Sequence, residues 1–236
     1  MENCTSCSCH GHLCIDNIPI FNDLTHEEKE SVMDASHHKK YKKGEMIFTP
    51  GDSFDSLFVV NKGIVKIFKL SILGKEQILR VLEPGDFMGE LSLFSKTILS
   101  NNAQALENSE ICIIKGSMIM ELLMKKPEIG IKFLQKYTQR IEESEELIEQ
   151  IGLRDVEQRI ANYLLLEIEK NVIEQKNNEY EITLPMSKKD FAALIGTSQE
   201  TLSRKLSLFQ DNGWIKLKEQ RKIIVTAMDS LKDINK

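Results

Sequence analysis

Apolar residues between positions 46 and 114 fall in short runs that turn residues separate. The runs are Met46–Phe48, Ser56–Val60, Gly63–Phe68, Gln77–Leu82 and Ile111–Ile114. Glycine-containing turns divide them, among them Pro50-Gly51-Asp52 and Pro84-Gly85-Asp86. Short β-rich runs with glycines at regular intervals are typical of an all-β barrel or jelly roll. A helix is predicted before them, starting at Thr25, because Glu28 lies three residues later and completes a capping box.

From Pro127 the apolar residues recur at steps of three and four, which predicts one long helix with a narrow stripe. Charged residues, mostly glutamates between positions 142 and 149, flank this stripe. So narrow a stripe favours pairing with a second helix, although packing on the chain's own barrel is the alternative. A polar stripe residue sets register at a cost in stability. The stripe positions are Leu134, Tyr137, Ile141, Ser144, Ile148 and Ile151.

After a hinge at residues 152–155, further helices are expected at about 156–169, 188–195 and 198–211, followed by a hairpin of 214–218 and 222–226. Ser187 caps one helix, Gly196 ends it, and Thr197-Ser198 caps the next. Two short helices joined at a glycine predict a helix-turn-helix, with the hairpin as its wing. The predicted fold class is therefore α+β: an N-terminal β jelly roll, a long dimerisation helix and a C-terminal winged helix-turn-helix.

The second helix of this pair carries polar residues that suit the reading of DNA bases. Arg204 can donate twice to guanine, Glu200 can accept from cytosine, and Gln199 and Ser203 can serve other bases. Residues 187–222 hold eight cations and four anions, a local charge of +4 on a chain whose net charge is −5. Phosphate binding needs such a basic patch. The predicted DNA contacts are Gln199, Glu200, Ser203, Arg204, Lys205, Lys188 and Lys189.

Composition narrows the class of protein. The chain has 236 residues, of which 41% are hydrophobic, so it can bury a core. We find neither a run of 18 apolar residues nor an apolar signal segment, so we expect a cytoplasmic protein outside the membrane. We also find no acid/base pair, nucleophile elbow or phosphate loop, and we expect no enzyme activity.

Four of the five cysteines stand in the first fourteen residues, at Cys4, Cys7, Cys9 and Cys14, and Cys112 follows far downstream. In a reducing compartment, clustered cysteines favour metal or redox chemistry over structural disulfides. A four-thiolate zinc site is one possibility, and direct thiol oxidation is another. His10 and His12 are further possible ligands.

The chain resembles the cyclic-AMP receptor and fumarate–nitrate reduction regulator (CRP/FNR) family over nearly its whole length. The resemblance is carried by Pro84–Leu91, by Gln199–Arg204 and by the long stripe helix between them. It implies a homodimer that binds palindromic promoter DNA and contacts RNA polymerase. It also implies four regions: 1–18 as a Cys-rich cluster-binding segment, 19–126 as a jelly-roll sensor domain, 127–152 as the dimerisation helix and 153–236 as the DNA-binding domain.

Within the family, the chain is more similar to the oxygen-sensing branch than to the cyclic-nucleotide branch. The cyclic-nucleotide branch has a phosphate-binding Arg-Ser pair in the stretch that corresponds to Thr97–Ala103, and this stretch has no arginine here, so we do not expect the chain to bind a cyclic nucleotide. The oxygen-sensing branch has an internal cysteine behind an Ala-Gln-Ala-Leu-Glu segment, which matches Ala103–Glu107 before Cys112. Haem-based members exist as well, but His37 and His38, followed by two lysines, look like surface residues.

That branch implies a [4Fe–4S] cluster held by four thiolates, sensing oxygen, redox state or nitric oxide. The ligands that match are Cys4, Cys7, Cys14 and Cys112, with Cys9 as a possible substitute. The spacing from Cys7 to Cys14 is one residue longer than the branch pattern. Glu200, Ser203 and Arg204 match the branch's recognition helix, whereas Gln199 departs from it. A two-fold symmetric dimer predicts half-sites about one helical turn, ~34 Å, apart.

Overall fold

The computed structural model describes residue 15 and residues 18–53, 55–95, 98–170 and 179–235. The chain divides into two compact units. One comprises Met1–Lys69 with Leu79–Ile141, and the other comprises Leu70–Ile78 with Glu142–Lys236. Each unit is described by itself.

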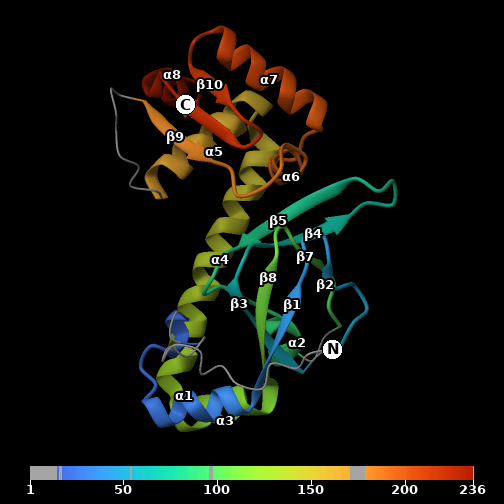
Figure 1. Ribbon diagram of the computed structural model, residues 1–236, viewed down its shortest axis with the longest axis vertical. Coiled ribbons are helices and arrows are strands. Elements are labelled where there is room, and N and C mark those ends of the chain that lie inside the picture. Colours follow the sequence, from blue (N-terminus) through green and yellow to red (C-terminus); the bar gives the residue numbers. More distant parts are fainter. Residues whose placement is uncertain (1–14, 16–17, 54, 96–97, 171–178, 236) are drawn as a thin grey trace. The chain divides into compact units, whose positions relative to one another are not determined.

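Within the described residues, eight strands form two four-stranded sheets (Figure 1), which confirms the predicted jelly-roll class, and each of the five predicted runs overlaps a strand. One sheet has the order β1-β8-β3-β6 and the other β2-β7-β4-β5. The pairs β1–β8, β3–β8, β3–β6, β2–β7 and β4–β7 are antiparallel. The strands are β1 (Ser36–Tyr41), β2 (Met46–Phe48), β3 (Ser56–Lys62), β4 (Val65–Leu70), β5 (Glu76–Leu82), β6 (Phe87–Met88), β7 (Asn102–Ala105) and β8 (Ser109–Lys115).

Strand β8 is buried on both faces, and its residues alternate between two hydrophobic clusters. Ile111 and Ile113 belong to the cluster that also holds residues of the second sheet, such as Ile67 and Ala103. Cys112 and Ile114 point to the opposite face. This alternation follows from the period of two along a strand. The face that carries Cys112 is therefore the outer face of its sheet.

Helices and the N-terminal part of the described chain cover this outer face. They are the 3₁₀ turn η1 (Pro19–Phe21), α1 (His26–Asp34), α3 (Gly116–Lys125) and the start of α4 (Pro127–Leu153). Helix α1 begins with the predicted capping box, in which Thr25 N–H donates to Glu28 and Glu28 N–H donates to the Thr25 hydroxyl. The short helix α2 (Glu90–Ser95) follows β6.

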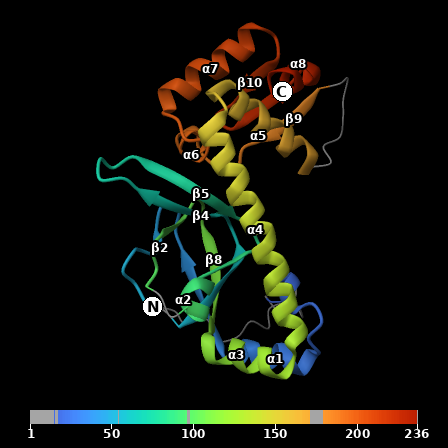
Figure 2. The same cartoon turned by 180° about the vertical axis from the view of Figure 1, so that it is seen from behind.

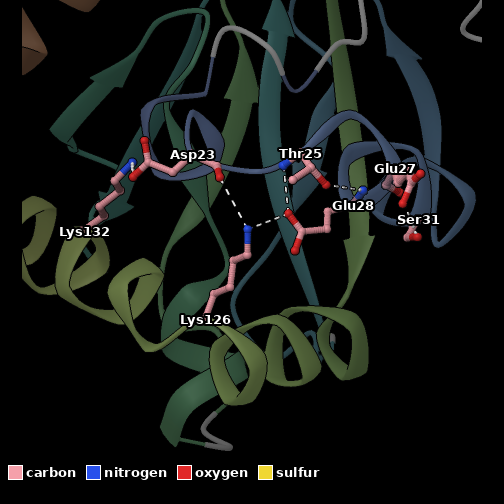
Figure 3. Close-up of polar contacts among 7 residues, drawn as sticks. All are labelled: Asp23, Thr25, Glu27, Glu28, Ser31, Lys126 and Lys132. Atoms are coloured by element: carbon pink, nitrogen blue, oxygen red, sulfur yellow. Dashed lines mark hydrogen bonds and ion pairs between the residues drawn. The ribbon is translucent and has the colours of Figure 1, made fainter.

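Two lysines tie the N-terminal segment to the start of α4 (Figure 3). Lys126 Nζ lies 2.6 Å from Glu28 Oε2, and Lys132 Nζ lies 2.6 Å from Asp23 Oδ2. Both ammonium groups also approach backbone carbonyls of this segment, those of Asp23 and Pro19, at 3.5 Å. The lysine on α4, Lys132, thus holds the chain that follows the cysteine-rich segment.

The remaining described elements build the predicted helix-turn-helix and wing (Figure 2). They are α5 (Val156–Lys170), β9 (Tyr180–Thr183), α6 (Lys188–Leu194), α7 (Gln199–Asp211), β10 (Ile215–Lys218), β11 (Lys222–Val225) and α8 (Met228–Ile234), and their sheet has the order β10-β11-β9. Gly196, between α6 and α7, has φ +72°. This left-handed conformation ends α6, and glycine adopts it at no steric cost. On α6, Phe191, Ala192 and Ala193 are buried, and Leu194 is half-buried.

The sequence predicted the long helix, the helix-turn-helix and the hairpin, but it gave no signal for β1, β6, β7, β9, α2, α3 or α8. Within the described residues, none of the helices has the length and apolar content to span a bilayer.

Candidate sensor, dimer and DNA-binding surfaces

Cys112 is fully buried on the outer face of β8, in a cluster with Ile15, Ile18 and Phe133. Ile15 directly follows Cys14 in the sequence. The other predicted ligands, Cys4, Cys7, Cys9 and Cys14, and also His10 and His12, lie outside the described residues. Among the residues that are described, there is no group of three or more His, Cys, Asp or Glu side chains placed to hold a metal.

His38 was expected on the surface, but it is largely buried. It is the register partner of Cys112 across β1 and β8, and its side chain is only 10% exposed. His38 shares a hydrogen bond with Cys112, and this bond raises the pKa of the imidazole, against the opposing effect of burial. Nδ1 of His38 lies 3.4 Å from Glu110 Oε1. His37, its neighbour in the sequence, is exposed, as expected.

A buried ion pair joins α4 to β6 and α2. Arg140 Nη1 lies 2.6 Å from Glu90 Oε1, and Arg140 Nη2 donates to the carbonyl of Phe87 at 2.6 Å. The guanidinium also stacks over the Phe87 ring, 4.3 Å from its centroid. Burial raises the pKa of Tyr137, which lies beside this pair on the same helix. The pairing of Arg140 with Glu90 was not predicted, because nothing in the sequence connects positions 50 residues apart.

A small cavity of about 50 Å³ adjoins Glu90, and Ser100 and Asn101 line it. The stretch 97–103 indeed contains no arginine, but Arg80 of β5 lines the cavity, and its Nη2 lies 3.8 Å from Glu90 Oε1. Burial, followed by the nearby Arg140, lowers the pKa of Arg80. A cation therefore does reach this site, from the predicted strand run Gln77–Leu82, whose arginine was not expected there.

The two faces of α4 differ sharply. Ile129, Phe133 and Arg140 are buried, whereas an apolar row on the helix is exposed to solvent. The exposed fractions are 67% for Leu134, 58% for Ile141, 71% for Ile148 and 41% for Ile151, and Ser144 is exposed as well. Tyr137 is half-buried. An apolar groove of about 550 Å³ adjoins the row, lined by Leu91 and Phe94 of α2 and by Leu134 and Tyr137 of α4.

Helix α7 has one buried face and one exposed face. The Ser198 hydroxyl accepts a hydrogen bond from the Thr201 N–H, which fixes the start of the helix. Leu202, Leu206 and Phe209 are fully buried. The predicted base-reading residues Gln199, Glu200, Ser203 and Arg204 are all exposed.

Several of the predicted cations near α7 already have carboxylate partners. The Lys205 ammonium binds Glu157 of α5. In the wing, Lys216 Nζ lies 2.6 Å from Glu179 and Lys222 Nζ lies 3.3 Å from Glu181. These two glutamates belong to the β9 region, outside the window 187–222 that gave a local charge of +4, so they lower the charge of this surface by two. Lys189 of α6 is exposed, and Lys188 is half-buried.

Comparison with known proteins supports both halves of this description. Residues 38–126 match the cyclic nucleotide-binding domain, and residues 158–234 match the Crp-like helix-turn-helix domain. The chain is 30% identical to electron transport regulator A of Shewanella oneidensis over 227 residues, which cover 94% of this chain and 88% of that protein.

Two further relatives have similar identities. The probable transcriptional regulator flp of Lacticaseibacillus casei is 27% identical over 93% of this chain and 97% of its own length. The cyclic AMP receptor protein of Thermus thermophilus is also 27% identical, over 84% of this chain and 88% of its own. Identity over the whole chain therefore does not separate relatives that carry different signals.

A solved structure of a CooA mutant from Carboxydothermus hydrogenoformans has the same fold, with a TM-score of 0.78 over 96% of this chain and 97% of that one, at 18% identity. The β sandwich, the long helix and the helix-turn-helix thus follow one another along the chain in the predicted order. From these matches, the chain belongs to the CRP/FNR family of DNA-binding transcriptional regulators.

Proposed function

We propose that this regulator senses oxygen, redox state or nitric oxide through a [4Fe–4S] cluster held by Cys112 and three N-terminal thiolates. The matched set is Cys4, Cys7, Cys14 and Cys112, with Cys9 as a possible substitute. The observation that carries the proposal is the shared cluster of Ile15 and Cys112. Ile15 directly follows Cys14 in the sequence, so a described neighbour of the cysteine-rich segment packs in the same cluster as Cys112.

The chemistry of the donors fits this cofactor. Thiolates are the usual ligands of [4Fe–4S] clusters, and the protein sets their behaviour through burial and hydrogen bonds to sulfur. Cys112 is fully buried and shares a hydrogen bond with His38. When bound, such a cluster supplies a redox-active and oxygen-labile group.

The residues around Cys112 give a physical route from the cysteines to α4. Ile129 and Phe133 of α4 pack in the same hydrophobic cluster as Cys112 and Ile15. Lys132 of α4 binds Asp23. A change in how the segment after Cys14 is held therefore alters the packing of the buried face of α4.

The exposed face of the same helix is where we place the second copy of the chain. A row of exposed leucine and isoleucine side chains on a soluble protein marks an interaction site. Their heptad-like spacing suits a parallel partner helix of the same sequence. The proposed dimer contacts are Leu134, Tyr137, Ile141, Ser144, Ile148 and Ile151.

The exposed residues of α7 form the proposed base-reading surface, with Lys188 and Lys189 contacting phosphates. Lys205 belongs to the proposed set too, but its ammonium must leave the Glu157 carboxylate before it can bind a phosphate. The two-fold symmetry of the dimer calls for palindromic promoter sites, and RNA polymerase is the partner that the family resemblance implies.

A cyclic nucleotide as the signal is the second candidate, because the jelly roll matches the cyclic nucleotide-binding domain. The cavity beside Glu90 argues against it. Its volume of about 50 Å³ is far below the ~300–1,000 Å³ of typical ligand pockets. The Glu90 carboxylate is also already paired with Arg140 of α4.

The test is to purify the full chain without oxygen, measure iron, sulfide and zinc, and record the visible spectrum and the affinity for DNA before and after exposure to air. We expect about four irons and four sulfides per chain, with loss of the spectrum and of DNA affinity in air. Cys112→Ala should abolish assembly, and Cys9→Ser should leave it intact. Iron-free protein with unchanged DNA binding would contradict the proposal. Bound zinc or haem would contradict it as well and identify a different cofactor. Micromolar nucleotide binding by calorimetry would favour the second candidate.

A further inference from the structure

Three polar side chains form a row on the outer face of the β1–β8 ladder: Glu110, His38 and Cys112. Glu110 and Cys112 lie two residues apart on β8, so their side chains share a face. His38 faces Cys112 in register from β1. The row thus reads carboxylate, imidazole, thiol, with 3.4 Å between Glu110 Oε1 and His38 Nδ1 and a hydrogen bond between His38 and Cys112.

The surroundings of the row limit what it can do. Cys112 is fully buried among Ile15, Val59 and Ile114, so its sulfur is closed to bulk solvent. The side chain of Glu110 is 22% exposed and that of His38 10% exposed, so the row runs from the protein edge inward. These three groups are not placed to hold a metal together. In the structure the imidazole is a hydrogen-bonding partner of the Cys112 sulfur.

We propose that His38 positions Cys112 as a cluster ligand by donating a hydrogen bond to its sulfur, and that Glu110 fixes the imidazole for this task. This inference rests on the proposed function and deepens it, since it names the group that tunes the buried ligand. Groups that hydrogen-bond to a metal ligand fix its orientation and tune the metal, and hydrogen bonds to the ligating sulfur act in this way in iron–sulfur sites.

The expected consequence is electronic as well as structural. A hydrogen bond withdraws electron density from a ligating thiolate, and hydrogen bonds to sulfur are among the factors that set the reduction potential of an iron–sulfur cluster. Without the donor, the sulfur carries more negative charge. The cluster should then have a lower midpoint potential and be lost faster in air.

The experiment compares His38→Leu, His38→Gln and Glu110→Gln in the full-length, anaerobically purified protein. The readouts are iron content, the midpoint potential and the iron–sulfur stretching frequencies in the resonance Raman spectrum. Glutamine keeps an N–H donor at a similar distance along the side chain. His37→Leu is the matched control, because it removes the same residue type from the adjacent, exposed position.

We expect His38→Leu to lower the midpoint potential and shift the stretching frequencies, His38→Gln to restore both, and Glu110→Gln to fall between. The control should match the wild type. A wild-type midpoint potential and wild-type stretching frequencies in His38→Leu would overturn this inference and leave the proposed function untouched. Loss of iron in His38→Leu that His38→Gln repairs supports it, whereas loss in both variants shows a packing role and overturns it. A wild-type protein without iron fails at the first assay and overturns the proposed function together with this inference.

Discussion

At the scale of the residue, Arg140 connects the buried face of α4 with β6 and α2. It is 7% exposed and reaches both Glu90 and the backbone of Phe87. Glu90 is 3% exposed, so its charge has no access to bulk water. Removing Arg140 takes away the closer of two guanidinium groups at the buried Glu90 carboxylate and leaves Arg80 at 3.8 Å, and losing one member of a buried pair costs far more than the pair contributes against an apolar replacement.

Arg140→Ala should therefore lower the free energy of unfolding by about 3–5 kcal/mol. Urea denaturation of the purified protein measures this. Lys136→Ala is the control one turn away, because Lys136 forms a more exposed pair with Asp86, and such surface pairs contribute about 0–1 kcal/mol. The double change Glu90→Gln and Arg140→Met should recover part of the loss. Equal stabilities of Arg140→Ala and the control would disprove the stabilising role of the pair.

A second residue-scale prediction concerns Arg204 on the exposed side of α7. Arg204→Ala should cost about 1–3 kcal/mol in binding and relax the preference at one base pair of each half-site. Lys189→Ala, which removes a proposed phosphate contact, should weaken all DNA sequences about equally and reduce the salt dependence. Binding titrations on a set of single-base variants separate the two. Retained preference at every base pair in Arg204→Ala would refute the base-reading role.

At the scale of the element, α4 packs one face on the hydrophobic cluster that holds Cys112 and exposes an apolar row on another. Ile141 lies near the middle of this row and is 58% exposed. A buried glutamate at the centre of a helix pair lacks a compensating partner and faces its own copy across the two-fold axis.

Ile141→Glu should therefore convert the dimer to a monomer with its fold intact. Sedimentation equilibrium gives the mass, and circular dichroism checks the fold. Gln135→Glu adds the same charge at an exposed position outside the row and should remain dimeric. A dimeric Ile141→Glu protein would mean that the chains associate elsewhere.

At the scale of the whole molecule, the proposed function requires that a signal received by the N-terminal segment alters α4. Lys126 and Lys132 hold that segment through Glu28 and Asp23. Replacing both lysines with methionine should preserve the cluster but reduce the ratio of DNA affinities measured before and after exposure to air. The control is Lys125→Met, because Lys125 pairs only locally with Glu121 on α3. An unchanged ratio in the double variant would exclude this connection.

Much of the architecture could be predicted because each element has a local signal. The capping box at Thr25, the turn at Gly196 and the stripe on α4 depend on neighbouring residues. The positions that bring the site together depend instead on strand register. His38 looked like surface because β1 carries charged residues at an exposed sheet edge, and only its pairing with β8 places it against Cys112.

The same reason explains why Arg80 and Arg140 were missed near Glu90. They come from β5 and α4, far apart in the sequence, and converge only after the sheets have formed and α4 has packed on them. The elements were readable from periodicity, but their contacts required the three-dimensional structure.

Ser144 has a consequence for how the regulator would behave in a population of cells. It interrupts the exposed apolar row of α4, and glutamates flank it. A dimer held by such a seam obeys mass action, so the dimeric fraction depends on the number of copies per cell as well as on the signal. The expression level would therefore set the sensitivity of the response. Cells with more of the protein would respond to a weaker stimulus, and this difference would be largest at promoters that the dimer binds weakly.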